Sequence, residues 1–254
     1  MYDYRNIEDF KEKSGYEIDG KWYPRVTKII DIKSKPALYR FYGEAASYNA
    51  AKEITENSAK EGTLIHEVVE KLMVGEKTEI PKEIAPAVNG FLSFVENKNI
   101  HVDKEFVEKR IFHPTHRYAG TIDTLALIDG KFGVLDIKTS QSIYRDYNLQ
   151  TSAYIEALLP ELPSLETRWI LRIDQTKKCF RCGSIMRPKG GRNKIRRGKT
   201  KPCPEAEHEW SDLTGQVEIQ EFPFWQEDFQ AFLGAKKLWE WENIHWLKQA
   251  GYLI

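Results

Sequence analysis

Two apolar stretches joined by Asp-Gly lie in the middle of the chain and restrict its fold more than any other feature. Residues 121–128 and 131–138 are rich in aliphatic side chains and flank Asp129 and Gly130. Asp-Gly is favoured in two-residue hairpin loops because both positions adopt a positive φ. The sequence therefore predicts a β-hairpin in which the numbers of directly opposed residues add to 259.

This register places two acids opposite each other, Asp123 and Asp136. A four-residue loop would keep the pairing, whereas a three-residue loop would not. Opposed like charges destabilise a strand pair. Lys138 shares a face with Asp136, while Ile137 points the other way, into the expected core. Two carboxylates beside an ammonium suit a hard cation such as Mg²⁺ or Mn²⁺. The alternative is that one acid simply faces water.

The rest of the pattern predicts a mixed α/β fold. Residues 1–20 are expected to form a partly ordered leader that ends in a turn at Asp19-Gly20, and residues 23–32 a short extended run. Apolar periodicity separates helices from strands. It predicts helices over 36–58, 62–73, the segment after Pro86, 148–159 and 225–249. Strands are predicted over 105–113, 121–128, 131–138, 167–174 and 215–222.

Bulk composition excludes some classes of protein. Formal net charge is zero, so any affinity for nucleic acid must come from local patches. No run of 18 apolar residues is present, which predicts no membrane span and no membrane partner. The polar start of the chain lacks a signal core, so a cytoplasmic location is expected. Three cysteines, an odd number, argue against a disulfide framework.

Four further polar residues are unremarkable when each is taken alone. His66 lies off the apolar stripe of its helix and would ordinarily be a surface or core histidine. Glu108 is placed in the middle of the predicted strand 105–113, where a solvated face is the common outcome. Gln150 and Tyr154 are four residues apart, so they share one face of a helix.

Taken together and in order, five short stretches resemble the PD-(D/E)XK nuclease superfamily, specifically its RecB-like exonuclease branch with phage-type and CRISPR-associated members. They are GTLIH (62–66), EFVEK (105–109), AGTID (119–123), VLDIK (134–138) and LQTSAY (149–154). The resemblance implies a restriction-endonuclease-like core in the order helix, strand, strand, strand, helix, strand. The sequence adds N-terminal helices, a long C-terminal helix and a small Cys-rich insert to this core. In RecB-like enzymes with an iron–sulfur cluster the cysteines flank the core, so the internal insert departs from that pattern.

Carried over to this chain, the resemblance implies a catalytic Mg²⁺ or Mn²⁺. Asp123, Asp136 and the main-chain carbonyl of Ile137 would bind this ion, with His66 as a further ligand. Such an ion lowers the pKa of its water and polarises a phosphoryl oxygen. Both one-metal and two-metal sites are compatible with these residues.

The resemblance also assigns roles to four other side chains. Lys138 would orient or activate the attacking water and stabilise charge on the scissile phosphate. Gln150 and Tyr154 would hold the substrate strand or the lysine, and Glu108 would support the site or a second metal. The expected activity is that of a metal-dependent deoxyribonuclease, and more specifically of an exonuclease on single-stranded or end-bearing DNA. The alternatives are a structure-specific or restriction-type endonuclease and a non-catalytic nucleic-acid-binding module.

A cysteine-containing insert interrupts the pattern at residues 176–210. Cys179 and Cys182 form a Cys-x2-Cys pair, and Cys203 and His208 follow, which predicts a structural Zn²⁺ site. Glu205 or Glu207 could replace His208 as fourth ligand. The alternative is a loop with three reduced, unbound cysteines. The chain is therefore expected to have three parts: an N-terminal leader and helical segment (1–58), a nuclease-like core (59–175 and 211–254) and the basic zinc-binding insert (176–210).

The insert is also strongly basic. Residues 177–201 contain 11 Lys and Arg residues and no acid, and we expect the zinc site to hold this run outward. Such a patch suits a phosphate backbone, although a solvated loop is the competing interpretation. Near the site, Tyr144, Arg145 and Tyr147 could stack on and hold an unpaired strand. The alternative for these three residues is ordinary packing where a loop joins a helix. The expected nucleic-acid contacts in the insert are Lys189, Arg192, Lys194, Arg196 and Arg197.

Overall fold

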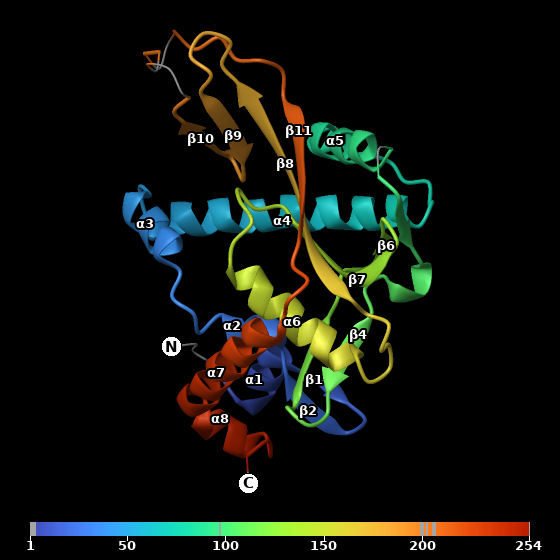
Figure 1. The fold of residues 1–254 in the computed structure, drawn as a ribbon. Helices are drawn as coiled ribbons and strands as arrows, with labels where there is room; N and C mark the ends of the chain where they lie inside the picture. The colour runs from blue at the N-terminus through green and yellow to red at the C-terminus, as the bar shows by residue number, and fades with distance from the viewer. Residues whose placement is uncertain (1–3, 97, 199–200, 202, 205–206, 254) are drawn as a thin grey trace.

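The computed structural model describes residues 4–96, 98–198, 201, 203–204 and 207–253. A mixed sheet with helices on both faces forms its centre (Figure 1), which confirms the predicted α/β class. The strands run in the order β10-β9-β8-β7-β6-β3, and β11 also pairs with β8. Their bounds are β3 Ile100–Val102, β6 Thr124–Ile128, β7 Lys131–Lys138, β8 Thr167–Lys178, β9 Ile185–Lys189, β10 Arg192–Arg196 and β11 Thr214–Glu221.

The predicted hairpin forms in the predicted register. Strands β6 and β7 are antiparallel, and Thr124 pairs with Leu135. Asp129 and Gly130 occupy the turn at φ 50° and 85°, the left-handed region that a two-residue loop of this kind requires. Strand β8 then lies parallel to β7 on the other side, so the carboxyl end of β7 lies inside the sheet rather than at an edge.

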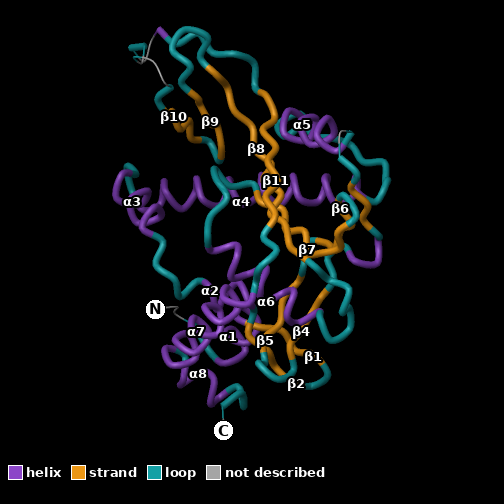
Figure 2. Tube along the Cα trace, viewed as in Figure 1, coloured by secondary structure: helices purple, strands orange, loops and turns teal. Residues whose placement is uncertain are grey.

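Helices cover the two faces of the sheet with separate apolar cores. Ile65 and Val69 of α4 and Phe91 of α5 pack against Leu135 and Ile137 of β7. On the opposite face, α6 packs together with the helices that gather at that end of the molecule (Figure 2). The bounds are α4 Tyr48–Met73, α5 Ala85–Val95, α6 Asp146–Leu158, α1 Ile7–Ser14, α2 Val26–Ile30, α7 Gln226–Glu242 and α8 Ile244–Gln249.

Residues 7–18 form regular structure, contrary to the prediction of a partly ordered leader over 1–20. Phe10 of α1 is fully buried against aromatic rings of α7 and α8. Strands β1 (Gly15–Ile18) and β2 (Lys21–Pro24) follow, joined by the predicted turn at Asp19-Gly20. The run 23–32, predicted to be extended, is mostly the helix α2, because burial of its apolar side chains decides between two conformations that local sequence leaves open.

Two predicted helices differ in extent. Residues 36–58 do not form one helix: α3 (Pro36–Glu44) ends first, and Ser47 caps the start of α4 by accepting from the backbone N–H of Ala50. Helix α4 then continues without a break through residues 58–59, where the expected segment boundary lies, and includes the predicted helix 62–73. The C-terminal helix is divided at Asn243 into α7 and α8.

The strand predicted over 105–113 is shorter than expected. A 3₁₀ turn occupies Lys104–Phe106, and only Arg110–His113 (β4) is extended. Strand β4 pairs with β5 (Tyr118–Thr121) in a small separate sheet, and β3 joins the main sheet instead. Glu108 adopts φ 51°, which interrupts any continuous strand at this point.

The insert is more regular than a loop-rich element. Strand β8 extends to Lys178, past the predicted end at 174, and pairs there with β9. A turn at Gly190 and Gly191, with φ 61° and 83°, joins β9 to β10. None of the described helices is long and apolar enough to cross a membrane.

Candidate metal and nucleic-acid site

Asp136 and Lys138 lie at the end of β7 and form an ion pair. The Lys138 Nζ is 2.6 Å from Oδ2 of Asp136, and Asp136 is completely buried. Apart from this ion pair, neither carboxylate oxygen has a hydrogen-bond partner among the described residues. Burial raises the pKa of Asp136 to about 6, although Lys138 opposes the shift. Burial alone would lower the pKa of Lys138, but Asp136 and Asp123 outweigh it and raise that pKa.

Asp123 lies across from Asp136 but not in the middle of a strand, as the hairpin prediction placed it. Strand β5 ends at Thr121 and β6 begins at Thr124, so Asp123 lies in a short break between them. Its Oδ2 accepts a hydrogen bond of 2.6 Å from the backbone N–H of Ile137. Burial raises the pKa of Asp123, against the effect of Lys138. The two acids therefore lie near the end of β7 and act on each other electrostatically, while their direct pairing across the hairpin stays a prediction.

Helix α4 contributes two more side chains, one of which sequence reasoning missed. His66 Nδ1 lies 3.8 Å from Oδ2 of Asp123 and 3.8 Å from Oε1 of Glu70. Ligand atoms of His66, Glu70 and Asp123 all lie within 4.8 Å of one another. Glu70 follows His66 by four residues, so the shared helix face was the signal that could have identified it.

The protonation of His66 and Glu70 follows from their burial. Burial and Lys138 lower the pKa of His66 to about 4, so the imidazole is neutral and can act as a ligand. Burial, Asp123 and Glu108 raise the pKa of Glu70 to about 8. Oε1 of Glu70 has no hydrogen-bond partner among the described residues. A buried carboxylate without a partner costs free energy that a bound cation would offset.

The oxygen atoms at this site fit a hard divalent cation. Glu70 is more than nine-tenths buried and keeps an oxygen without a hydrogen-bond partner among the described residues, and its ligand atoms lie close to those of His66 and Asp123. Asp136 is outside this close group, and its buried carboxylate pairs only with Lys138 among the residues that the structure describes. Carboxylate oxygens with one imidazole are ligands that Mg²⁺ or Mn²⁺ accepts. The expected role of the Ile137 carbonyl as a further ligand stays a prediction.

Gln150 and Tyr154 of α6 lie together, as their spacing predicted. Gln150 Nε2 donates a hydrogen bond of 3.0 Å to the hydroxyl of Tyr154, whose side chain is buried. Burial, followed by Asp136, raises the pKa of Tyr154, which places this hydroxyl in the electrostatic field of the acids. Tyr147, which the sequence indicated as a residue that could stack on an unpaired strand, lies on the same helix, and its ring centroid is 5.1 Å from Nζ of Lys138.

Glu108 reaches the site through its backbone rather than from a strand. The prediction of a mid-strand position is wrong, because Glu108 occupies a left-handed turn ahead of β4. Its N–H donates a hydrogen bond of 2.9 Å to the carbonyl of Asp123. Its carboxyl is close enough to contribute to the raised pKa values of Glu70 and Asp123. A role in holding a second metal stays a prediction.

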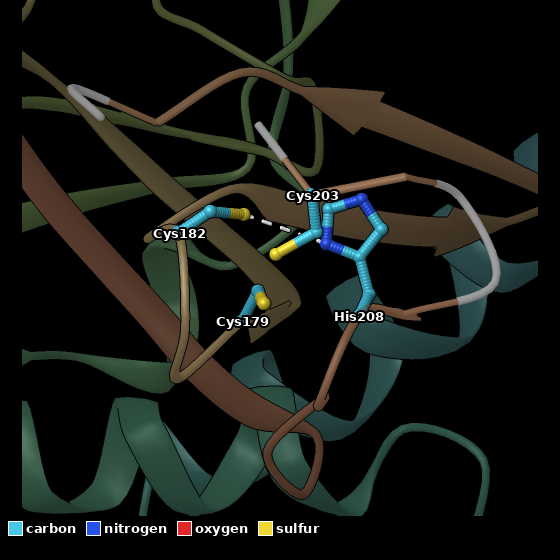
Figure 3. Close-up of side chains that lie close together, drawn as sticks. All are labelled: Cys179, Cys182, Cys203 and His208. Atoms are coloured by element: carbon cyan, nitrogen blue, oxygen red, sulfur yellow. Dashed lines mark hydrogen bonds between the residues drawn. The ribbon is translucent and has the colours of Figure 1, made fainter. Parts of the chain in front are cut away.

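The insert contains a second candidate metal site of different chemistry. Figure 3 shows the side chains of Cys179, Cys182, Cys203 and His208 turned toward one another, and their ligand atoms all lie within 4.8 Å. The Sγ of Cys182 is 3.5 Å from Nδ1 of His208. Three sulfurs and one imidazole nitrogen can hold a metal ion such as zinc. Glu207, an alternative fourth ligand, is exposed and lies near Arg181, while Glu205 lies outside the described residues.

Backbone geometry prepares these cysteines for a cation. The Gly183 N–H donates to the carbonyl of Cys179, which closes a tight knuckle at 2.9 Å. Backbone N–H groups lower the pKa of Cys182 to about 7. For Cys179, burial raises the pKa, but hydrogen bonds from backbone N–H groups outweigh burial and lower the pKa to about 7. Burial and the other two thiols raise the pKa of Cys203 to about 11. A cation would stabilise all three thiolates together.

The basic run is not held outward along its whole length. Arg187 and Lys189 of β9 turn inward and both donate to the carbonyl of Thr139, at 2.8 and 2.6 Å. That expectation is therefore wrong for these two residues, because their strand continues the central sheet and packs beside α4. In the predicted nucleic-acid surface, Lys189 and Arg192 are partly exposed, and the exposed residues are Tyr144, Arg145, Lys194, Arg196 and Arg197.

Comparison with known proteins adds no relative. The chain matches no protein-family model, and a search of curated proteins finds no match to it.

Proposed function

We propose that this protein is a metal-dependent nuclease that hydrolyses phosphodiester bonds. The observation that carries the proposal is the pair Asp123 and Asp136 at the end of β7: Asp123 is held by the N–H of Ile137, and the buried carboxylate of Asp136 has only the Lys138 ammonium as a partner among the described residues. The RecB-like resemblance supports DNA with single strands or free ends as substrate and supports exonuclease action. The exposed cations of β10 support binding to a phosphate backbone.

His66, Glu70, Asp123 and Asp136 would hold the divalent cation. When bound, such an ion polarises a phosphoryl oxygen and makes water a better nucleophile at neutral pH. Because its pKa is raised, Lys138 carries its proton at neutral pH. This favours a role in stabilising negative charge on the phosphate over a role as general base. Gln150 and Tyr154, joined by their hydrogen bond, would orient Lys138 or the substrate strand.

The test is a cleavage assay on end-labelled single-stranded DNA, duplex DNA, closed circular DNA and RNA, with Mg²⁺, Mn²⁺ or EDTA. We expect metal-dependent cleavage that Asp136→Asn abolishes. Shortening from an end, with closed circles intact, would support an exonuclease, whereas cutting of circles would support an endonuclease. Binding without cleavage of any substrate in either metal would refute the proposal and favour a non-catalytic binding module.

A further inference from the structure

Two cations of the insert lie next to the residue that follows Lys138. Arg187 and Lys189 are two positions apart on β9, so their side chains share a face. Both donate to the carbonyl of Thr139, which directly continues β7. The hairpin therefore places two positive charges at the end of the strand that carries Asp136 and Lys138.

The two charges differ in how they are neutralised. Arg187 Nε lies 2.6 Å from Oδ2 of Asp174, and Asp174 is buried. Lys189 has no carboxylate oxygen within 4.0 Å among the described residues, and its one hydrogen-bond acceptor there is the neutral carbonyl of Thr139. An ammonium has three N–H donors. Lys189 therefore retains both charge and donors for another anion.

Packing of the hairpin tip on α4 fixes the position of Lys189. A Cβ on Gly190 would lie 2.4 Å from the carbonyl oxygen of Ile54 and 2.2 Å from Oγ of Ser58, so only glycine permits this approach. The Gly190 N–H also donates to Oε2 of Glu61 at 3.4 Å. The same helix carries His66, five residues further along from Glu61.

Electrostatics place Lys189 within reach of the acidic site. The charge of Lys189 contributes to the lowered pKa of His66, together with that of Lys138. Burial, followed by Arg187, lowers the pKa of Lys189 itself to about 8, against Glu61 and Asp174. A partly buried ammonium without an ionic partner is destabilised unless an anion joins it. A phosphate group supplies that anion.

We propose that Lys189 binds a phosphate of the nucleic-acid strand held at the Asp123–Asp136 site, so that the insert forms one wall of that site. The inference rests on the proposed function and deepens it. It differs from a general basic patch, because one inward-facing residue binds the phosphate beside the reacting end of β7. Arg187, neutralised by Asp174, holds the Thr139 carbonyl without contributing free charge.

The test measures binding of a fluorescently labelled 30-nucleotide oligo(dT) by anisotropy over a salt series, with cleavage blocked by Asp136→Asn. Lys189→Gln removes the charge and keeps an N–H donor, while Lys189→Arg keeps the charge. For Lys189→Gln we expect weaker binding and a slope of log K against log salt reduced by about 0.7, which is the share of the slope that one neutralised phosphate contributes on single-stranded DNA. Lys189→Arg should restore the parent slope.

Lys131→Met is the matched control, since Lys131 pairs with Glu221 at the opposite end of β7 and should leave the slope unchanged. A Lys189→Gln slope equal to that of the parent would overturn the inference, even if cleavage slowed, because Lys189 would then act only through Thr139. If Lys189→Gln unfolds, the slope of Lys189→Met decides, after circular dichroism confirms its fold. If Lys189→Gln reduces the slope but the wild-type protein cleaves no substrate, Lys189 binds phosphate and the proposed nuclease function is wrong.

Discussion

The carboxylate of Asp123 accepts a hydrogen bond of 2.6 Å from the backbone N–H of Ile137, the residue between Asp136 and Lys138. This bond holds the break before β6 against the end of β7. It orients one acid beside a second, fully buried acid. The bond therefore holds one acid of the candidate site in place, and a bound cation would compensate the charge of the buried carboxylates.

Glu70 should make stability depend on pH. Its pKa is about 8 in the folded protein and near 4.5 when unfolded, so between pH 6.5 and 8 the folded state binds an extra proton. Stability from this group therefore falls as pH rises through that range, by about 1–2 kcal/mol. His66, with a folded pKa of about 4 and an ordinary value of 6.5, is half protonated only in the unfolded state at pH 6.5, so its contribution to stability rises by about 0.4 kcal/mol over this range and opposes part of the Glu70 effect.

Urea unfolding of metal-free wild type and Glu70→Gln at pH 6.5 and 8 checks this prediction. As pH rises, the free energy of unfolding of wild type should fall relative to that of Glu70→Gln. The thiols titrate in both proteins, so their effect cancels in the difference. Added Mn²⁺ should stabilise wild type more at pH 8 than at 6.5, because a carboxyl must lose its proton to bind a metal. A difference that does not vary with pH would contradict the assignment.

Lys138→Met should uncouple cleavage from metal binding. The cleavage rate is expected to fall by about 10²–10⁴-fold, the range typical of a residue that transfers a proton or stabilises charge. Mn²⁺ should bind at least as tightly as in wild type, because the ammonium 2.6 Å from Asp136 competes with the cation. Calorimetric Mn²⁺ titration and the end-labelled assay measure the two effects. Full cleavage by this variant would remove Lys138 from the mechanism.

The Cys179–His208 cluster should hold about one zinc per chain, since its four ligand atoms match a tetrahedral site. Elemental analysis of purified protein is the measurement. Cys203→Ser should lose most of the zinc and make the remaining two thiols reactive, whereas Glu207→Gln, whose carboxylate faces Arg181, should retain it. Iron, or no metal at all, would show that the assignment is wrong.

Arg168→Met should strongly destabilise the protein. Arg168 is fully buried, donates to the carbonyls of Phe222 and Phe224 and forms an ion pair with Asp228. Removal of the cation leaves these acceptors without partners, at a cost of about 3–5 kcal/mol. Arg145→Met, at an exposed position, should change the free energy of unfolding by no more than about 0.5 kcal/mol. Equal urea midpoints for the two variants would contradict this prediction.

Gly120→Ala should displace Tyr154. A Cβ at residue 120 would lie 2.5 Å from Cε1 of Tyr154, so the ring must move from beside Gln150. We expect a loss of about 1–3 kcal/mol in stability and reduced cleavage. Gly43→Ala, in a helix where the added Cβ meets nothing within 4 Å, should instead be neutral or stabilising. Thermal unfolding and the cleavage assay compare the pair, and an undisturbed Gly120→Ala protein would refute the close approach.

Local chemistry determined the parts of this protein that sequence alone could predict. The Asp-Gly turn sets the register of its hairpin because only a few loop types join two strands, so the pairing of Thr124 with Leu135 followed from residue numbers, which places Asp123 near the end of β7. The Gln150–Tyr154 pair followed from helix geometry in the same way. The cysteine cluster followed from residue type and spacing, since few side chains can serve as soft ligands.

Tertiary structure decided what depends on contacts between distant segments. Glu70 becomes a site residue only because α4 packs its polar face against the break before β6. Glu108 leaves its predicted strand because β3 takes that place in the sheet. Lys189 turns inward because the insert extends β8 and packs on α4. In each case, burial against a segment distant in sequence stabilised a conformation that the local residues alone do not favour. The local sequence cannot predict this outcome, because it does not specify which distant segment packs there.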